Sequence, residues 1–413
     1  MRFTVADIFA GCGGLSHGFV RTGLFDVVLG TDIDERSLDT FAHNHAKYGS
    51  NPITVPGDIR AIAPSDLASK LIPLGLDQAG SLDVLVGGPP CEGFSQNRRQ
   101  EVILPNGERA FVRNPLDSND PRNDLFRYFL VLVELLRPKM VIIENVPQMV
   151  SSRKGATVQE IKRTLSKFGY EVSWKILTAT DFGVPQKRRR AFVVAWKQGL
   201  DPFEWPTPTH GTETDSTGLF PKFKPTVTTF DAIADLPAAL KKESGRGALG
   251  PYTKTNSDFA NSMQSMSGSP MNHVARVPGE QVLRRLRAMK PGMITSDLPA
   301  DLRPKSHYYN CYGRLSWDLP AKTITKSCNY LGSGCFGHPE EDRGITMREA
   351  ARIQSFDDDF DFLSNSEPHI AKMIGSAVPP LLASVLAAQV AKTLDSSLNP
   401  PQVLVRPGQG QGF

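Results

Sequence analysis

Cysteine is scarce in this sequence, and long apolar runs are missing from it. Only 5 of the 413 residues are cysteine, an odd number scattered along the chain. This excludes a disulfide framework and makes a reducing cytosol the expected compartment. No run of about 18 apolar residues is present, so we expect no membrane span. The first seven residues also lack the apolar core of a secretory signal.

A large excess of one charge is also absent, since 47 basic residues stand against 43 acidic ones, for a net charge of +4. The distribution is uneven. Residues 1–85 contain 6 basic and 10 acidic side chains, whereas residues 86–200 contain 19 and 11. A locally basic face suits a polyanion such as nucleic acid. An ordinary solvated surface fits the same count equally well.

Strand and helix signals alternate through the first 200 residues. Apolar, β-rich runs occupy 4–9, 25–29, 82–86, 140–143 and 191–196, and helical patterns occupy 15–21, 34–45 and 125–136. This alternation predicts an α/β fold, a doubly wound, mostly parallel Rossmann-like sheet covered on both faces. Ligands bind such sheets beyond the carboxyl ends of the strands, so the loops that follow the strands are where we expect chemistry.

The amino-acid composition and the hydrophobic periodicity change after residue 198. Residues 201–225 are rich in proline and residues 244–272 in Ser, Gly, Asn and Met, which predicts a second, smaller and irregular domain. Helical periodicity returns at 346–355 and 380–394. We expect residues 396–413 to form a flexible tail.

A glycine turn, Gly11-Cys12-Gly13-Gly14, joins the first strand to the first helix. It is not a dinucleotide fingerprint, because Ser16 stands where the third glycine should be. Asp32, at the end of the next strand, is suited to accept from ribose hydroxyls, and Asp58 from an exocyclic amine. These parts fit a nucleoside cofactor without a pyrophosphate, such as S-adenosylmethionine. An ordinary turn with two surface acids is the alternative.

Cys91 lies in the stiff loop Gly87–Ser95, directly after a buried strand. Two prolines precede it and restrict the backbone, which favours a functional thiol over a small buried hydrophobe. Cys12, Cys311, Cys328 and Cys335 lack metal-ligand spacing, so no metal is expected.

Two further sites carry chemistry. Glu144 ends a buried strand, where partial desolvation suits a carboxyl group to donate a proton near neutral pH; a plain strand cap is the alternative. Gln186, Arg188 and Arg190 alternate along a predicted strand and would share one face. Three long donors there could hold a base carbonyl, a phosphate or Glu144, or could be only a solvated basic strand start.

Seven motifs, in order, resemble those of the DNA (cytosine-5) methyltransferase family. They are Asp7–Gly14, Gly88–Ser95, Asp120–Phe126, Glu144–Val146, Gln186–Arg190, Arg343–Gln354 and Ile374–Pro380. The resemblance covers most of the chain and implies methyl transfer from S-adenosylmethionine, with S-adenosylhomocysteine as product, to C5 of cytosine in double-stranded DNA.

The resemblance also implies residue roles. Cys91 would be the nucleophile and Glu144 the acid at cytosine N3, with Arg188 and Arg190 holding the base and Glu144. Phe9 and Ile33 would flank the adenine of the cofactor. The other cofactor-binding candidates are Gly11, Gly13, Asp32, Asp58, Ile59, Pro90, Leu125, Ser376 and Ala377, and the DNA-binding candidates are Ser95, Arg122, Asn145, Gln186 and Thr323.

The family's chemistry explains these residue types. Cytosine C5 is a poor nucleophile until a thiolate adds at C6 with help at N3. Nearby arginines favour the Cys91 thiolate. A base stacked in duplex DNA is out of reach, so it must be flipped out.

The family also implies a discontinuous large domain, residues 1–198 plus 369–395, with residues 199–368 for target recognition. Three features depart from its usual pattern. Glu92 replaces a common Gln, Ser376 replaces a common Asn, and the basic segment 96–119 is longer than in compact relatives. We expect this segment to belong to a loop that closes over DNA.

The resemblance leaves two other functions open. One is tRNA cytosine-C5 methylation by the same fold, which the Cys91–Ser95 loop and the long second domain disfavour. The other is a silent nucleic-acid-binding module, which the intact set of Cys91, Glu144 and the arginines disfavours. The expected setting is a monomer in the bacterial cytoplasm, associated with the nucleoid and paired with a restriction endonuclease without a stable complex.

Overall fold

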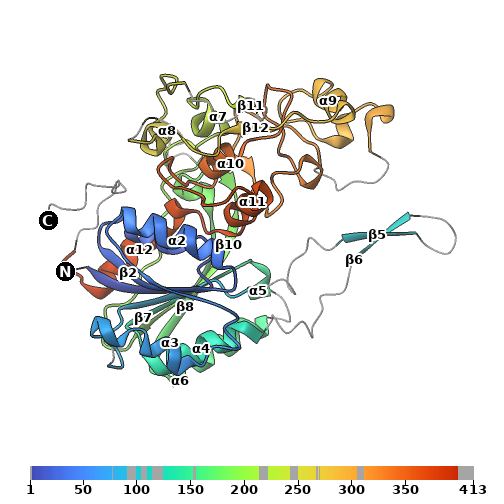
Figure 1. Cartoon of the computed structure of the whole chain (residues 1–413). Coiled ribbons are helices and arrows are strands. Elements are labelled where there is room, and N and C mark those ends of the chain that lie inside the picture. Colours follow the sequence, from blue (N-terminus) through green and yellow to red (C-terminus); the bar gives the residue numbers. More distant parts are fainter. Residues whose placement is uncertain are drawn as a thin grey trace.

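The fold described here is that of a computed structural model of the whole chain. It describes residues 2–76, 78–90, 99–103, 109–113, 124–151, 155–213, 222–241, 250–266, 268, 270–304 and 311–398. The molecule has a sheet lobe and a second, irregular lobe stacked on it (Figure 1).

A seven-stranded sheet in the order β3-β2-β1-β4-β7-β10-β8 organises the first lobe. The strands are β1 (Phe3–Ile8), β2 (Phe25–Asp32), β3 (Ile53–Pro56), β4 (Val84–Gly87), β7 (Met140–Asn145), β8 (Tyr170–Thr178) and β10 (Arg189–Lys197). Strands β1, β2, β3, β4 and β7 are paired in parallel, and β10 is antiparallel to both β7 and β8. The expected mostly parallel α/β sheet is confirmed.

Helices cover both faces of this sheet (Figure 1). One face carries α1 (Gly14–Val20), α2 (Glu35–Lys47) and α12 (Pro380–Leu394), and the other carries α3 (Pro64–Ser69), α4 (Leu125–Leu136) and α6 (Ala156–Lys167). Alternate strand residues supply the two cores: Ile142 joins the cluster with α1 and α12, and Ile143 the cluster with α4 and α6. Burial on both faces explains the continuous apolar strand sequences.

Helix α12, near the C-terminus, returns to the sheet lobe. Helix α12 packs on α1 so closely that a Cβ on Gly18 would overlap Ala383. Length and composition alone would let the stretch Glu367–Leu394 cross a membrane, but 72% of its most apolar window is buried inside the protein. That burial is typical of core helices.

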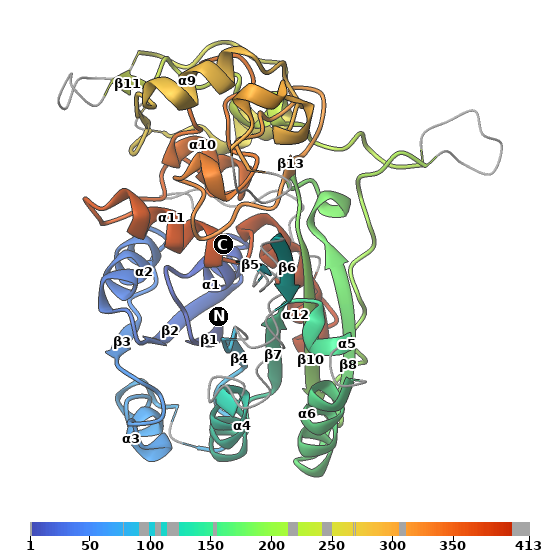
Figure 2. The ribbon, with the colours of Figure 1, turned by 90° about the vertical axis from the view of Figure 1, so that its right-hand side faces the viewer.

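The second lobe is built from short helices and connecting segments around its own apolar cluster (Figures 1 and 2). Its elements are α7 (Thr229–Ile233), β11 (Leu240–Lys241), α8 (Asp258–Met263), β12 (Val274–Ala275), α9 (Glu280–Arg287), α10 (Met347–Ile353) and α11 (Glu367–Ser376). Arg352 of α10 is fully buried and pairs with Asp235 at 3.1 Å and Asp358 at 2.6 Å. The expected domain boundaries at 198 and 369 stay a prediction.

In the described part of the chain, three two-stranded pairings lie outside the main sheet, and one of them is the parallel pair β11–β12 of the second lobe. Strands β5 (Arg99–Ile103) and β6 (Arg109–Arg113) form an antiparallel hairpin that projects away from the sheet lobe (Figure 1). Strands β9 (Gln186–Lys187) and β13 (Ala321–Lys322) pair in parallel and so tie the second lobe to the entry of β10.

Candidate active site

Glu144 lies near the carboxyl end of β7 and faces an arginine from the neighbouring strand. Arg190 Nε is 2.7 Å from Glu144 Oε1, and the two side chains are only 15% and 11% exposed. Phe192 is the direct partner of Glu144 in the antiparallel register, so Arg190 is its diagonal neighbour. The register of β7 and β10 therefore positions the pair.

The chain segment that leads to Cys91 runs past this acid. A Cβ on Gly88 would lie 3.2 Å from Glu144 Oε2, and Asn145 Nδ2 donates to the Pro89 carbonyl at 3.1 Å. Pro90, the next residue, is exposed. Glu144 and the start of the cysteine loop are thus neighbours, whereas Cys91, Ser95 and Arg122 lie outside the described residues, as do Glu92 and most of segment 96–119.

The glycine turn meets Asp32 at the carboxyl edge of the sheet. Asp32 Oδ2 accepts from the Gly11 N–H and Oδ1 from the Asp34 N–H, both at 2.9 Å. Burial raises the pKa of the Asp32 carboxyl, and these two N–H groups partly offset the rise. Gly11 and Gly13 adopt φ of 55° and 90°, a left-handed backbone that favours glycine.

The space around this turn suits a nucleoside. No described residue lies within 4 Å of a Cβ built on Gly11, so the described part of the chain leaves the turn open on that side. Ile33 is 71% exposed, while Phe9 and Ile59 pack against one apolar cluster. Asp58 lies on the surface in an ion pair with Arg60. The turn thus combines a carboxylate, exposed apolar surface and open space, which fits an adenosine moiety.

A buried acid beneath the turn was part of a motif but had no assigned role. Asp7 of β1 is only 2% exposed, and none of the residues that the structure describes forms a hydrogen bond with its Oδ2. Burial raises the pKa of Asp7 to about 7, against hydrogen bonding from Ser16 in the first turn of α1. Its place inside a strand that ends in the glycine turn is the signal that could have singled it out.

Contrary to the prediction from the sequence, the side chains of the 186–190 segment do not share one face of a strand. Arg188 falls between β9 and β10 and is fully buried, with its two terminal nitrogens donating to the carbonyls of Ile324, Gly375 and Ala377 at 2.9–3.0 Å. Arg190 turns instead to Glu144. Within the described part of the chain, Nε of Arg188 has no hydrogen-bond partner.

The remaining candidates surround these groups. Thr323 Oγ1 donates to the Lys187 carbonyl at 2.9 Å, and Gln186 is fully buried. Leu125 is buried at the start of α4. Ser376 is exposed at the end of α11, next to Ala377.

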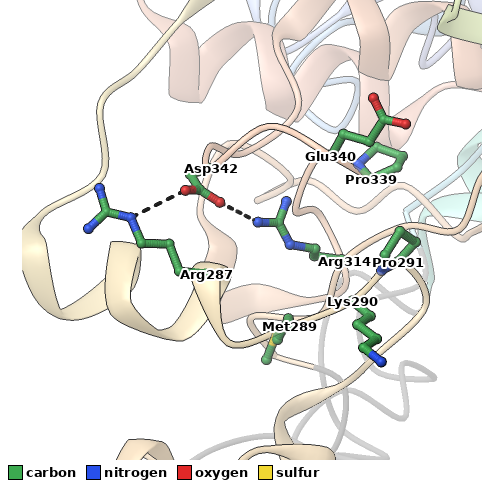
Figure 3. A pocket seen from close by; sticks show the side chains of 8 residues that line it. All are labelled: Arg287, Met289, Lys290, Pro291, Arg314, Pro339, Glu340 and Asp342. Atoms are coloured by element: carbon green, nitrogen blue, oxygen red, sulfur yellow. Dashed lines mark hydrogen bonds and ion pairs between the residues drawn. The ribbon is translucent and has the colours of Figure 1, made fainter.

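A pocket lined by residues of the second lobe lies apart from these groups (Figure 3). It measures about 370 Å³ beside α9, and Asp342 bridges Arg287 and Arg314 in its wall. None of the expected site residues lines it. Among the residues that the structure describes, no three His, Cys, Asp or Glu side chains form a metal cluster.

Comparisons with known proteins identify the family. The model of the C-5 cytosine-specific DNA methylase family matches residues 3–392. The Type II methyltransferase M1.HphI of Haemophilus parahaemolyticus is 31% identical over 95% of this chain and 87% of its own length. DNA (cytosine-5)-methyltransferase 1A of rice, Oryza sativa subsp. japonica, is 30% identical over 94% of this chain, which spans only 28% of that longer protein.

A solved structure agrees on the fold. It is a prophage-encoded E. coli protein described as a DNA modification methyltransferase, with a TM-score of 0.68 and 23% identity over 95% of this chain and 99% of that one. The family model and the Type II relatives confirm the resemblance drawn from the seven motifs. The chain belongs to the family of C-5 cytosine-specific DNA methylases, enzymes of the DNA (cytosine-5)-methyltransferase class.

Proposed function

We propose that this enzyme methylates C5 of a cytosine within a specific double-stranded DNA sequence, through a covalent bond between Cys91 and C6 of a flipped-out base. The observation that carries the proposal is the Glu144–Arg190 pair, buried against the Gly88–Pro90 segment that leads directly to Cys91. The three parts that cytosine activation needs are thus adjacent in space or in sequence.

The proposed cofactor is S-adenosylmethionine, which supplies an electrophilic methyl group when bound and is released as S-adenosylhomocysteine. Asp32 would hold its ribose, Phe9 and Ile33 would flank its adenine, and Asp58 would lie near the adenine amino group. Gly11, Gly13, Ile59, Pro90, Leu125, Ser376 and Ala377 would line the rest of the site. The open side of Gly11 and the exposed Ile33 support this assignment.

The protein's own groups do the rest of the chemistry. The Cys91 thiolate forms a bond to C6 while Glu144 donates a proton to N3, so the C5=C6 electron pair becomes available for attack from C5. Arg190 holds the Glu144 carboxyl in place. After methylation, a solvent base takes the C5 proton, and the C5–H electron pair re-forms the C5=C6 bond as the C6–S pair leaves on the Cys91 thiolate. N3 returns its proton to Glu144, which restores the ring and the acid.

The second lobe is the proposed reader of the DNA sequence, through loops that enter the major groove. Thr323, Asn145, Ser95 and Arg122 are the proposed DNA-side residues, whereas the fully buried Gln186 holds the segment that contains Thr323. The bacterial relatives named as Type II methyltransferases support a role in restriction–modification. A monomer in the bacterial cytoplasm is part of the same proposal.

The proposal is tested with the purified protein and S-adenosylmethionine carrying a labelled methyl group. We expect label to enter double-stranded DNA but not tRNA. Cys91→Ser should abolish transfer while leaving DNA binding intact. Glu144→Gln, which keeps shape but removes the proton donor, should slow the methyl-transfer step by about 10²- to 10⁴-fold.

Label in tRNA alone would overturn the DNA substrate. Retained activity in Cys91→Ser would overturn the nucleophile. Mapping of methylated cytosines in plasmid DNA from a host that expresses the gene would then identify the target sequence.

A further inference from the structure

Three segments far apart in the sequence meet at Arg188. They are the entry to β10 at 186–188, the second-lobe segment 321–326 that contains Thr323, and the end of α11 at 375–377. We call these contacts the three-segment junction. The inference drawn from this junction rests on the proposed function, because one segment contains the proposed DNA-side residue Thr323 and another the proposed cofactor-site residues Ser376 and Ala377.

Side chains from the first segment bind both backbone polar groups of Ile324, its N–H and its carbonyl. The Ile324 N–H donates to Gln186 Oε1 at 3.0 Å, and the Ile324 carbonyl accepts from Arg188 at 3.0 Å. The pairing of β13 with β9 continues the attachment, with Ala321 opposite Gln186. Segment 321–326 is thus held by both side chains and backbone.

Arg188 also reaches the end of α11, and Gln186 is linked to it through Gln354. Arg188 donates to the carbonyls of Gly375 and Ala377 at 3.0 and 2.9 Å. Gln354, which accepts from Gln186, also donates to the Ala377 carbonyl at 2.6 Å. The planar fork of arginine suits such a task, because it presents several donors in fixed directions.

The second and third segments also touch directly. A Cβ on Gly375 would overlap the carbonyl of Thr325 and the nitrogen of Lys326. No space remains for the turn at 375–377 to shift toward segment 321–326. Close-packed contacts of this kind transmit displacement.

We propose that Arg188 and Gln186 are positioning residues that join the Thr323 segment and the Ser376–Ala377 turn into one unit, so that cofactor binding and DNA binding assist each other. Arg188 has no exposed surface, and its terminal nitrogens are already bound to three carbonyls. Its role is therefore to hold backbone, whereas Arg190 is the arginine that contacts Glu144.

The test measures linkage between two ligands. DNA affinity is measured by fluorescence anisotropy with and without S-adenosylhomocysteine, and the affinity for S-adenosylhomocysteine by calorimetry with and without DNA. For the wild type we expect each ligand to increase the affinity of the protein for the other ligand by about 5- to 150-fold, the usual range of such coupling. We call this factor the coupling ratio. The factor by which S-adenosylhomocysteine increases the DNA affinity must equal the factor by which DNA increases the affinity for S-adenosylhomocysteine, because linkage is reciprocal.

Two variants break the junction in different ways. Arg188→Lys keeps the charge but removes the fork, and Gly375→Ala adds a methyl group that forces segment 321–326 away from α11. We expect both to bring the coupling ratio close to one. Gly279→Ala is the matched control, because nothing lies within 4 Å of its added Cβ, and it should keep the wild-type ratio. If Arg188→Lys fails to fold, Gly375→Ala carries the test.

The outcomes separate the two proposals. A wild type that methylates DNA but shows a ratio of one, or variants that keep the wild-type ratio, would overturn the junction proposal alone. A wild type that methylates no DNA would overturn the proposed function and this inference with it.

Discussion

Arg188 and Arg190 are two residues apart in one basic cluster, yet the fold gives them different partners. Arg188 is fully buried and donates to three carbonyls from two distant segments. Arg190 lies 2.7 Å from Glu144. The break between β9 and β10 at residue 188 turns the two side chains to different partners. The cluster therefore combines one backbone clamp with one partner of the proposed acid.

Asp7 provides a pH prediction at the scale of a single residue. Burial raises the pKa of its carboxyl to about 7 in the folded protein, from about 4 in an unfolded chain. The folded state therefore binds this proton more tightly, so stability falls as pH rises from about 4 to about 7 and is level above that. Between pH 5 and 8 we expect a loss of about 2 to 3 kcal/mol from this group.

Asp7→Asn isolates that contribution, because the amide keeps the shape and does not titrate. The free energy of unfolding of both proteins is measured in urea across this pH range. The wild type should lose stability relative to Asp7→Asn as pH rises. A constant difference between the two proteins would contradict the prediction. Burial would raise the pKa of Glu349, but Arg343 lowers it to about 2. The chosen pH range lies above the acidic region in which Glu349 begins to bind a proton.

At the scale of elements, α1 and α12 depend on glycine at their contact. A Cβ on Gly18 would overlap Ala383 and the Pro380 carbonyl. Gly18→Ala should therefore destabilise the protein by about 1–3 kcal/mol through overpacking, although alanine favours a helix more than glycine does. Urea unfolding measures the change. Gly279→Ala, with open space around its Cβ, is the control, and equal effects of the two changes would contradict the packing argument.

Helices and strands could be predicted where the residues within the element itself carry a clear pattern. Helix α4 has the predicted bounds, Leu125–Leu136, because an apolar periodicity ends at Arg137-Pro138, and α12 begins at the predicted Pro380. Strand β8 was not predicted. It is an edge strand with a mixed burial pattern and an exposed Trp174, so its sequence carries no clean alternation.

The candidate site follows the same rule. Asp32 and Glu144 were predictable because both come at the carboxyl end of a recognisable strand. The contacts of Arg188 were not, since its acceptors are backbone carbonyls more than 130 residues away in sequence. Any residue type can present a carbonyl, so no sequence pattern marks such a partner.

At the scale of the whole molecule, the small net charge conceals two unlike regions. The first 85 residues are acidic on balance and contain Asp32 and Asp58, whereas residues 86–200 are basic on balance. The basic region includes hairpin β5–β6, which projects from the sheet lobe (Figure 1). Its register pairs Arg99 with Arg113.

This hairpin allows a test of where the DNA backbone runs. Each phosphate that a basic side chain neutralises adds about 0.9 to the slope of log affinity against log salt. The double change Arg109→Gln and Arg113→Gln should therefore lower that slope by about 2, measured by anisotropy from about 50 to 200 mM KCl. Arg127→Gln is the control, because Arg127 lies on α4 in an exposed pair with Glu160, and its slope should match the wild type. An unchanged slope in the double variant would mean that the hairpin arginines do not contact phosphate and that the basic face used for DNA lies elsewhere, among the residues around Lys187.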